Sequence, residues 1–167
     1  MDRSKIKDLY LGFGSNLGDS GHLITRAIKE VASNSHIEFV KQSSLWRSEA
    51  MYDEEQPDFV NAVAKYQSDL LPTEILNYIG EIESRFFRVR DPLRPKGPRT
   101  LDIDIIFYGD KVVDLPSLTI PHPRFHERKF ILLPMSEIDV NYRVPGTSLS
   151  INDYIQRCPD KSKLEKI

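Results

Sequence analysis

Apolar residues along this chain switch between two spacings, one typical of β-strands and the other of α-helices. Short apolar or alternating runs predict strands at residues 8–13, 37–46, 59–66 and 100–108. Apolar residues three and four positions apart predict amphipathic helices at about 20–33 and 71–87. The segment GSNLGD, which joins the first strand to the first helix, is interpreted as a turn with a helix cap at Asp19 or Ser20.

The order strand, helix, strand, strand, helix, strand predicts the fold class. It is the order of an α+β, ferredoxin-like βαββαβ sandwich, in which an antiparallel sheet carries its helices on one face. Two segments, 47–58 and 88–99, are too long for tight turns and predict substrate-binding loops. A hairpin, a loop with His122 and an apolar run at 130–133 follow. We expect a single domain over 1–167, with a charged tail that frays after about residue 160.

Composition narrows the classes of protein that fit. The chain has 40% hydrophobic and 29% charged residues, a balance that predicts a water-soluble globule. Its net charge is only -2, which argues against nonspecific nucleic-acid binding, so any anion site must be local. Cys158 is the single cysteine, which excludes an internal disulfide and favours the reducing cytoplasm. The charged N-terminus leads into a short strand, so we expect neither a secretory signal nor a membrane span.

Two aspartates on the last predicted strand are the first candidates for chemistry. Strand alternation places Asp102 and Asp104 on the face opposite Ile103 and Ile105. The two carboxylates are then roughly 6.5 Å apart along the strand, a spacing from which they can share hard cations. Magnesium fits this pair better than zinc, which prefers histidine or thiolate. For an Asp-x-Asp pair alone, the commoner alternative is that both side chains simply face solvent.

A basic loop just before this pair favours a phosphate site. The segment RVRDPLRPKGPR has three prolines and one glycine among its positive charges, a composition that resists regular structure. Arginine forks bind phosphate oxygens while metal ions bridge phosphates, so this combination is typical of phosphoryl transfer. A solvated basic loop is the alternative. His122, between Pro121 and Pro123, is either a phosphate donor or a structural histidine.

Four segments in order, GFGSNLGD, QPDFVNAV, GPRTLDIDII and LTIPHPRFHERKF, resemble the 6-hydroxymethyl-7,8-dihydropterin pyrophosphokinase family of folate biosynthesis. The resemblance covers nearly the whole chain. It implies transfer of the terminal diphosphate of ATP to the hydroxymethyl group of the reduced pterin, with AMP as the second product and two magnesium ions (Mg2+) as cofactors. The partners that it implies are ATP and the pterin. We also expect no nucleic acid or membrane as a partner, a cytoplasmic location and a monomer.

The resemblance also implies roles for individual residues. It assigns catalysis to Arg88, Arg99, Asp102 and Asp104, with the two aspartates as metal ligands. It places the following residues at ATP: Glu83, Arg88, Arg90, Arg99, Ile105, Thr119, His122 and Arg128. At the pterin it implies that Phe59 and Phe130 sandwich the ring and that the Asn61 amide pairs with its polar edge. It also implies backbone contacts from Ser48 and Met51.

The sequence departs from the family pattern at several positions. Lys96 stands where a tryptophan is common, and Pro95 where a basic residue is usual, in the loop that closes over both substrates. Other residues replace side chains that often touch the nucleotide, namely Gly80, Ser117 and Pro123. Two rival functions have the same predicted fold: a ligand-sensing module without phosphate chemistry, and an RNA binder, which the absence of an RNP-type aromatic block disfavours.

Overall fold

The computed structural model describes residues 1–48, 55, 57–86, 93 and 101–167. In the first part of the chain the elements are a 3-10 turn η1 (Arg3–Lys5), β1 (Lys7–Ser15), α1 (Ser20–Val31), β2 (Ile37–Gln42), β3 (Trp46–Ser48), β4 (Phe59–Ser68) and α2 (Pro72–Arg85). The second part contains β5 (Asp102–Tyr108), β6 (Val113–Leu115), β7 (Leu118–Ile120), η2 (Phe125–Glu127), α3 (Lys129–Asp139), α4 (Ile151–Arg157) and β8 (Leu164–Lys166).

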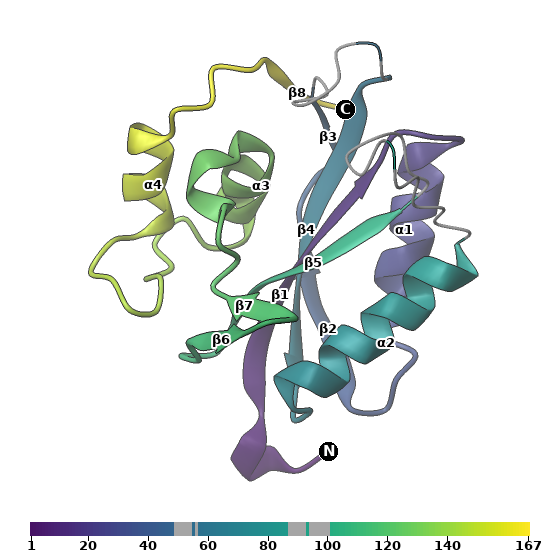
Figure 1. Ribbon diagram of the computed structural model, residues 1–167, viewed down its shortest axis with the longest axis vertical. Coiled ribbons are helices and arrows are strands. Elements are labelled where there is room, and N and C mark those ends of the chain that lie inside the picture. Colours follow the sequence, from purple (N-terminus) through teal and green to yellow (C-terminus); the bar gives the residue numbers. More distant parts are fainter. Residues whose placement is uncertain (49–54, 56, 87–92, 94–100) are drawn as a thin grey trace.

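The main sheet confirms the predicted fold class. Its strands lie in the order β5-β1-β4-β3-β8, and β2 pairs with the other part of β4 (Figure 1). Each of these pairings is antiparallel. If β2 and β3 count as one interrupted strand, this is the arrangement of a βαββαβ ferredoxin-like sandwich. The hairpin predicted after residue 108 is also present, as β6 paired with β7.

Local sequence signals define the two helices that were predicted. The Asp19 side chain accepts the His22 backbone N–H at 3.2 Å and so caps α1. Pro72 occupies the first turn of α2, where a missing N–H costs nothing, and Glu74 accepts the Leu71 N–H at 2.7 Å. Both helices therefore begin where cap chemistry predicts.

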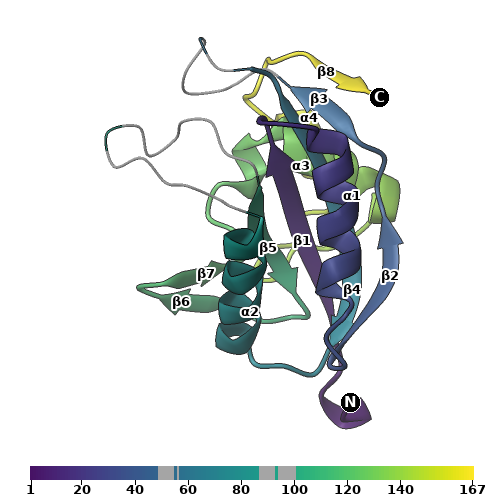
Figure 2. The ribbon, with the colours of Figure 1, turned by 90° about the vertical axis from the view of Figure 1, so that its right-hand side faces the viewer.

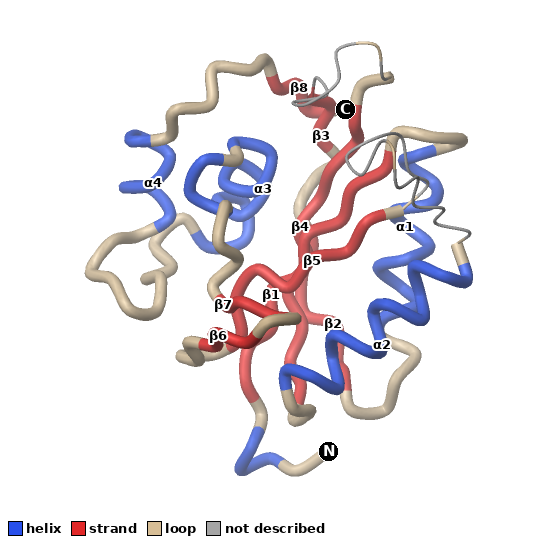
Figure 3. Tube along the Cα trace, in the orientation of Figure 1, coloured by secondary structure: helices blue, strands red, loops and turns tan. Residues whose placement is uncertain are grey.

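Helices cover both faces of the sheet, which corrects the expectation that they lie on one. Helices α1 and α2 pack on one face, and α3 and α4 lie on the other (Figures 1 and 3). The cause is that the central strands carry apolar side chains on both sides. Leu11 and Ile105 join the core under α1 and α2, whereas Tyr10, Val63 and Ile106 join the core under α3 and α4. A second apolar face needs its own cover.

The structure differs from the predicted elements at two further places. The strand expected at 37–46 is broken between β2 and β3. At the break, the Ser43 backbone N–H donates to the Val63 carbonyl at 2.8 Å, and the Ser43 hydroxyl accepts the Val63 backbone N–H at 3.0 Å. The tail after residue 160, which was expected to fray, instead carries β8, which pairs with β3. None of the described helices has the length and apolar character that crossing a membrane requires.

Candidate active site

Strand β5 presents Asp102 and Asp104 on the face opposite the helices α1 and α2. Ile103 and Ile105 are each 4% exposed in the core under those helices, while both aspartates are half-buried on the other side. Asp102 lies opposite Gly14 of β1, and Asp104 lies opposite Gly12. The alternation predicted for this strand is therefore confirmed.

Gly14 of β1 lies between Asp102 of β5 and the polar side chain of Asn61 on β4. Asn61 of β4 is also opposite Gly14, so Asp102, Gly14 and Asn61 form one row across three strands. A Cβ at position 14 would lie 3.1 Å from the Asn61 Oδ1 atom and 3.9 Å from the Phe59 ring. Since strands lie about 4.8 Å apart, the backbones of Asp102 and Asn61 are separated by about 10 Å with no side chain between them.

Sequence reasoning missed this role of Gly14, which we had interpreted only as part of a turn. A signal was present, because the segment LGFGS places glycine at alternate positions of a strand. In a strand, alternate positions lie on one face. Glycines at 12 and 14 therefore indicate a stretch of sheet on which side chains of the neighbouring strands can lean over the backbone.

The residues expected at the pterin occur together beside this row. Asn61 donates its Nδ2 hydrogen to the Ser48 hydroxyl at 2.8 Å, and both side chains are buried. Ser48 lies opposite Phe59 in the β3–β4 pair, and Phe59 is half-buried. Phe130 is at the start of α3, which packs on the same face of the sheet. Met51 lies outside the described residues.

Arg128 lies immediately before α3 and contacts the Phe130 ring. Its guanidinium carbon is 5.6 Å from the ring centroid, within the range of a cation–π contact. The Arg128 Nε atom is buried, and it has no hydrogen-bond partner in the part of the chain that the structure describes. Buried donors are usually satisfied, so this N–H is suited to an oxygen acceptor of a ligand.

His122 is held as a neutral imidazole near the aspartates. Its backbone N–H donates to the Ile106 carbonyl at 2.9 Å, and its Nδ1 accepts the Arg124 backbone N–H at 3.1 Å. Burial, reinforced by Arg128, lowers the pKa of His122 to about 4, and the negative charge of Asp102 opposes this shift. Because Nδ1 is an acceptor, the single proton of the neutral ring is on Nε2, which is then a hydrogen-bond donor.

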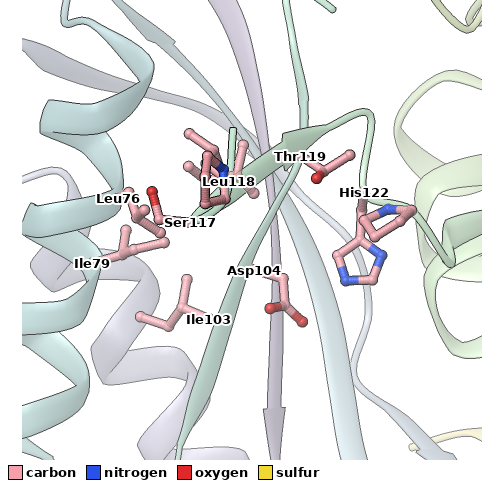
Figure 4. Close-up of a pocket in the computed structure, with 11 residues that line it drawn as sticks. Leu76, Ile79, Ile103, Asp104, Ser117, Leu118, Thr119 and His122 are labelled. Atoms are coloured by element: carbon pink, nitrogen blue, oxygen red, sulfur yellow. The ribbon is translucent and has the colours of Figure 1, made fainter. Parts of the chain in front are cut away.

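A pocket of about 260 Å³ opens at the edge of β5, next to Asp104 and His122. Figure 4 shows Asp104, Thr119 and His122 on one side of β5 and the apolar side chains of Leu76, Ile79 and Ile103 on the other. Ile105, Ser117, Leu118 and Pro123 also line the pocket, together with Pro116. Gly80, which like Ser117 and Pro123 replaces a side chain that often touches the nucleotide in the family, is not among the lining residues. The pocket therefore combines an apolar wall with a carboxylate and an imidazole.

Glu83 reaches β5 from helix α2. Its Oε2 atom accepts the backbone N–H of Ile103 at 3.2 Å, between the two aspartates in the sequence. The predicted site residues Arg88, Arg90 and Arg99 lie outside the described residues, as do Arg94, Pro95 and Lys96 of the same loop. Apart from these arginines and Met51, the predicted site residues lie within the described part of the chain, and Ile105 differs from the two aspartates in facing the core under α1 and α2.

The donor set at Asp102 and Asp104 suits magnesium. Within residues 1–48, 55, 57–86, 93 and 101–167, no group of three or more His, Cys, Asp or Glu side chains has the arrangement of a metal site. Magnesium does not need one, because it commonly takes one or two carboxylates and completes its octahedron with water and substrate phosphate. The two half-buried carboxylates on one face meet that requirement.

Comparison with known proteins decides the family. The model of the 7,8-dihydro-6-hydroxymethylpterin-pyrophosphokinase (HPPK) family matches residues 10–140. The chain belongs to the HPPK family. An HPPK relative from Haemophilus influenzae, 2-amino-4-hydroxy-6-hydroxymethyldihydropteridine pyrophosphokinase, is 35% identical over 156 residues, which are 93% of this chain and 96% of the relative. The Synechocystis protein of the same name is 38% identical over 88% of this chain and 74% of its own length.

Longer proteins also contain an HPPK-like part. The Pneumocystis carinii "Folic acid synthesis protein fol1" is 41% identical over 91% of this chain, which spans only 20% of that protein. A crystal structure of Plasmodium falciparum HPPK-DHPS with pteroate superposes with a TM-score of 0.71 over 92% of this chain and 42% of that one. Its sequence identity is 14%, so this likeness supports the fold alone.

Proposed function

We propose that this chain transfers the terminal diphosphate of ATP to the hydroxymethyl group of 6-hydroxymethyl-7,8-dihydropterin, with Asp102 and Asp104 as magnesium ligands. The family match and the pyrophosphokinase relatives support this reaction, which is a step of folate biosynthesis. The H. influenzae relative matters most here, because this chain covers 96% of its length.

One observation carries the assignment of the site. The two aspartates lie between two different binding environments, the partly apolar pocket beside β5 and the Ser48–Asn61 pair beyond Gly14. A transferase that joins two substrates needs such a central position for the reacting groups, because holding both in a reactive geometry lowers the barrier. Two carboxylates that only face solvent would have no reason to lie beside both the pocket and the Ser48–Asn61 pair.

The pocket beside β5 is our proposed site for the nucleoside part of ATP. Leu76, Ile79 and Ile103 supply an apolar wall, and Thr119 and Asp104 supply polar groups at its other side. Most small-molecule sites combine a largely apolar lining with a few polar groups that fix orientation. From this pocket the phosphates extend towards Asp104 and His122.

The pterin then occupies the other side of the aspartates. The Asn61 amide, held by Ser48, pairs with the polar edge of the ring, and Phe59 and Phe130 contact its faces. Two strand spacings separate Asn61 from Asp102, which is about 10 Å, a distance that a bicyclic ring with a hydroxymethyl arm spans.

Two described side chains bind phosphate oxygens in this proposal. His122 donates from Nε2 as a neutral ring, and Arg128 donates from its buried Nε as a permanent cation. Asp102 and Asp104 would hold the magnesium, which would supply positive charge to offset the charge developing on the transferred group. Arg88 and Arg99, assigned from the family motif, provide further guanidinium groups in the same role.

A product assay tests the function. Purified protein is incubated with ATP, magnesium and 6-hydroxymethyl-7,8-dihydropterin, and the nucleotide products are separated by chromatography. We expect AMP and the pterin diphosphate in equal amounts, with no product when EDTA removes the metal. Accumulation of ADP would mean that a single phosphate is transferred, and the absence of any product would contradict the proposal.

A further inference from the structure

The C-terminal segment lies outside the part of the chain that matches the family model, yet it contacts both sides of the proposed pterin site. The match ends at residue 140, and the segment 158–167 follows α4. Figure 1 shows it in yellow, running from α4 past α3 to β8 beside β3. Figure 2 shows β8 at the same end of the sheet as β3.

Helix α3 lacks a cap of its own and takes one from this segment. Arg128 occupies the N-cap position without a side-chain hydrogen bond, and the first turn contains no acidic residue. The Asp160 Oδ2 atom accepts the backbone N–H of Lys129, the first residue of the helix, at 3.1 Å. A carboxylate at a helix N-terminus satisfies a free N–H and interacts favourably with the helix dipole.

Asp160 makes one more hydrogen bond, and Lys129 makes a second contact with the same turn. Its Oδ1 atom accepts the Ser162 backbone N–H at 2.8 Å, and the Lys129 ammonium donates to the Ser162 carbonyl at 3.2 Å. Burial disfavours the charged carboxylate, but the hydrogen bonds from Ser162 and Lys129 outweigh it and hold the pKa of Asp160 below its ordinary value. Lys129 therefore contacts this segment twice, through its backbone N–H to Asp160 and through its ammonium group to the Ser162 carbonyl.

The other end of the segment supports the opposite wall of the site. Leu164 of β8 lies opposite Ser48 in β3, and Ser48 accepts the hydrogen bond from Asn61. Lys166 contacts the Trp46 ring at 5.2 Å and Glu137 at 3.6 Å, and the Ile167 N–H donates to the Leu45 carbonyl at 2.9 Å. The segment therefore ties the start of α3 to β3 at its two ends.

We propose that Asp160 is a positioning residue for the pterin end of the site, because it anchors the backbone between Arg128 and Phe130. Those two residues flank Lys129, so a displacement of the Lys129 backbone moves both the phosphate-binding guanidinium group and the aromatic ring. This proposal rests on the proposed function, since it gives Arg128 and Phe130 the substrate contacts described above.

The test compares three variants. Asp160→Ala removes the acceptor, whereas Asp160→Asn keeps a side-chain oxygen that can cap the helix. Glu165→Gln is the matched control: it removes one negative charge from the same segment, and Glu165 is exposed on β8, where its ion pair is with Lys163 at 3.2 Å. All assays are run well below the unfolding temperature of each variant.

We expect Asp160→Ala to raise the KM for the pterin about 5- to 10-fold, the size that corresponds to loss of a helix cap. Asp160→Asn should recover most of this loss, and Glu165→Gln should behave as the wild type. A purely structural role would lower the thermal midpoint of Asp160→Ala and leave its pterin KM unchanged. A pterin KM within twofold of the control would therefore overturn the proposal.

Hydrogen exchange separates this proposal from the proposed function. Without substrates, the Lys129 amide, read by NMR, should exchange about tenfold faster in Asp160→Ala than in Glu165→Gln. Equal exchange rates in an active enzyme would refute the anchor and leave the reaction intact. A wild-type protein without pyrophosphokinase activity, but with faster exchange in Asp160→Ala, would refute the reaction while the anchor stands.

Discussion

The two faces of the main sheet are built from the same strands but differ in what they hold. Under α1 and α2 the face is an apolar core, in which Leu9, Leu11 and Tyr66 are fully buried. The edge of this core supplies the apolar wall of the pocket beside β5. The other face is apolar only where α3 and α4 cover it. Near residues 14, 61 and 102 it carries the aspartates, Asn61 and a glycine. The comparison teaches that alternate residues of one strand can serve different purposes. In β5 the side chains that face α1 and α2 mainly stabilise the fold, and the two aspartates that face the other way are the candidates for chemistry.

The sharpest test of this division is at Asp104. Asp104→Asn keeps the shape of the side chain and removes the charge that the metal requires. We expect kcat to fall by about three orders of magnitude or more, because a metal ligand acts mainly on the transition state. AMP formation measures the effect, with Asp114→Asn on the exposed strand β6 as the control. Near-normal turnover in Asp104→Asn would contradict the metal role.

The opposite face should respond in the opposite way. Leu11→Ala removes a fully buried side chain of β1, three residues before Gly14. We expect the free energy of unfolding to decrease by about 3 kcal/mol, as for other large-to-small core substitutions. Urea unfolding measures this loss, and kcat and KM of the folded variant should stay near the wild-type values. A selective rise in one KM would mean that the two faces are not independent.

The low pKa of His122 predicts a pH dependence that the apolar face lacks. Its folded pKa of about 4 is below the ordinary value of 6.5, so between these values the unfolded state binds more protons and stability falls as the pH decreases. Full burial would make this shift worth about 3 kcal/mol, and screening by solvent reduces it to about 1–2 kcal/mol.

The measurement is urea unfolding of the wild type and of His122→Asn at several pH values from about 7 to 4, without substrates or metal. His122→Asn should show the smaller loss of stability on acidification, because it has no imidazole to protonate. Parallel pH profiles for the two proteins would contradict a neutral buried histidine.

The smallest expected effect is at Gly14. Gly14→Ala places a methyl group 3.1 Å from the Asn61 Oδ1 atom, so the amide must shift. We expect the pterin KM to rise about fivefold, equivalent to roughly 1 kcal/mol, with little change in the ATP KM. Gly80→Ala is the control, because a Cβ there meets no atom within 4 Å and alanine favours a helix. An unchanged pterin KM in Gly14→Ala would remove Asn61 from the pterin contacts.

The sequence was most informative where one period repeats. The alternation in TLDIDIIFY correctly separated Asp102 and Asp104 from their isoleucine neighbours, and Pro72 and Asp19 marked the starts of α2 and α1. The roles of Asp102 and Asp104 as metal ligands, and of the other site residues, remain predictions that the variants above test.

Other features could not be predicted because they depend on contacts between distant residues. The short apolar run at 130–133 gave no helical period, and α3 takes its cap from Asp160, 31 residues away in the sequence. The strand β8 depends on its pairing with β3 and not on a strong local pattern in LEK. The second helical layer was likewise not predictable, because it depends on the packing of Tyr10 and Val63 against residues of α3 and α4 far away in the sequence.

The irregularity in β5 limits how this strand can change length. Tyr10 pairs with Phe107 and Leu11 pairs with Ile105, so Ile106 is an extra residue in a β-bulge. The bulge lets Ile106 and Phe107 both enter the core under α3 and α4 while the acids upstream keep their side of the sheet. Deleting Ile106 would restore a regular alternation, with the acids and Phe107 still on their faces, but it would remove the Ile106 side chain from that core. A one-residue deletion between Asp102 and Ile105 would instead turn the side chains on one side of the deletion to the opposite face of the sheet. Upstream of the bulge, this strand should therefore tolerate few insertions or deletions during divergence.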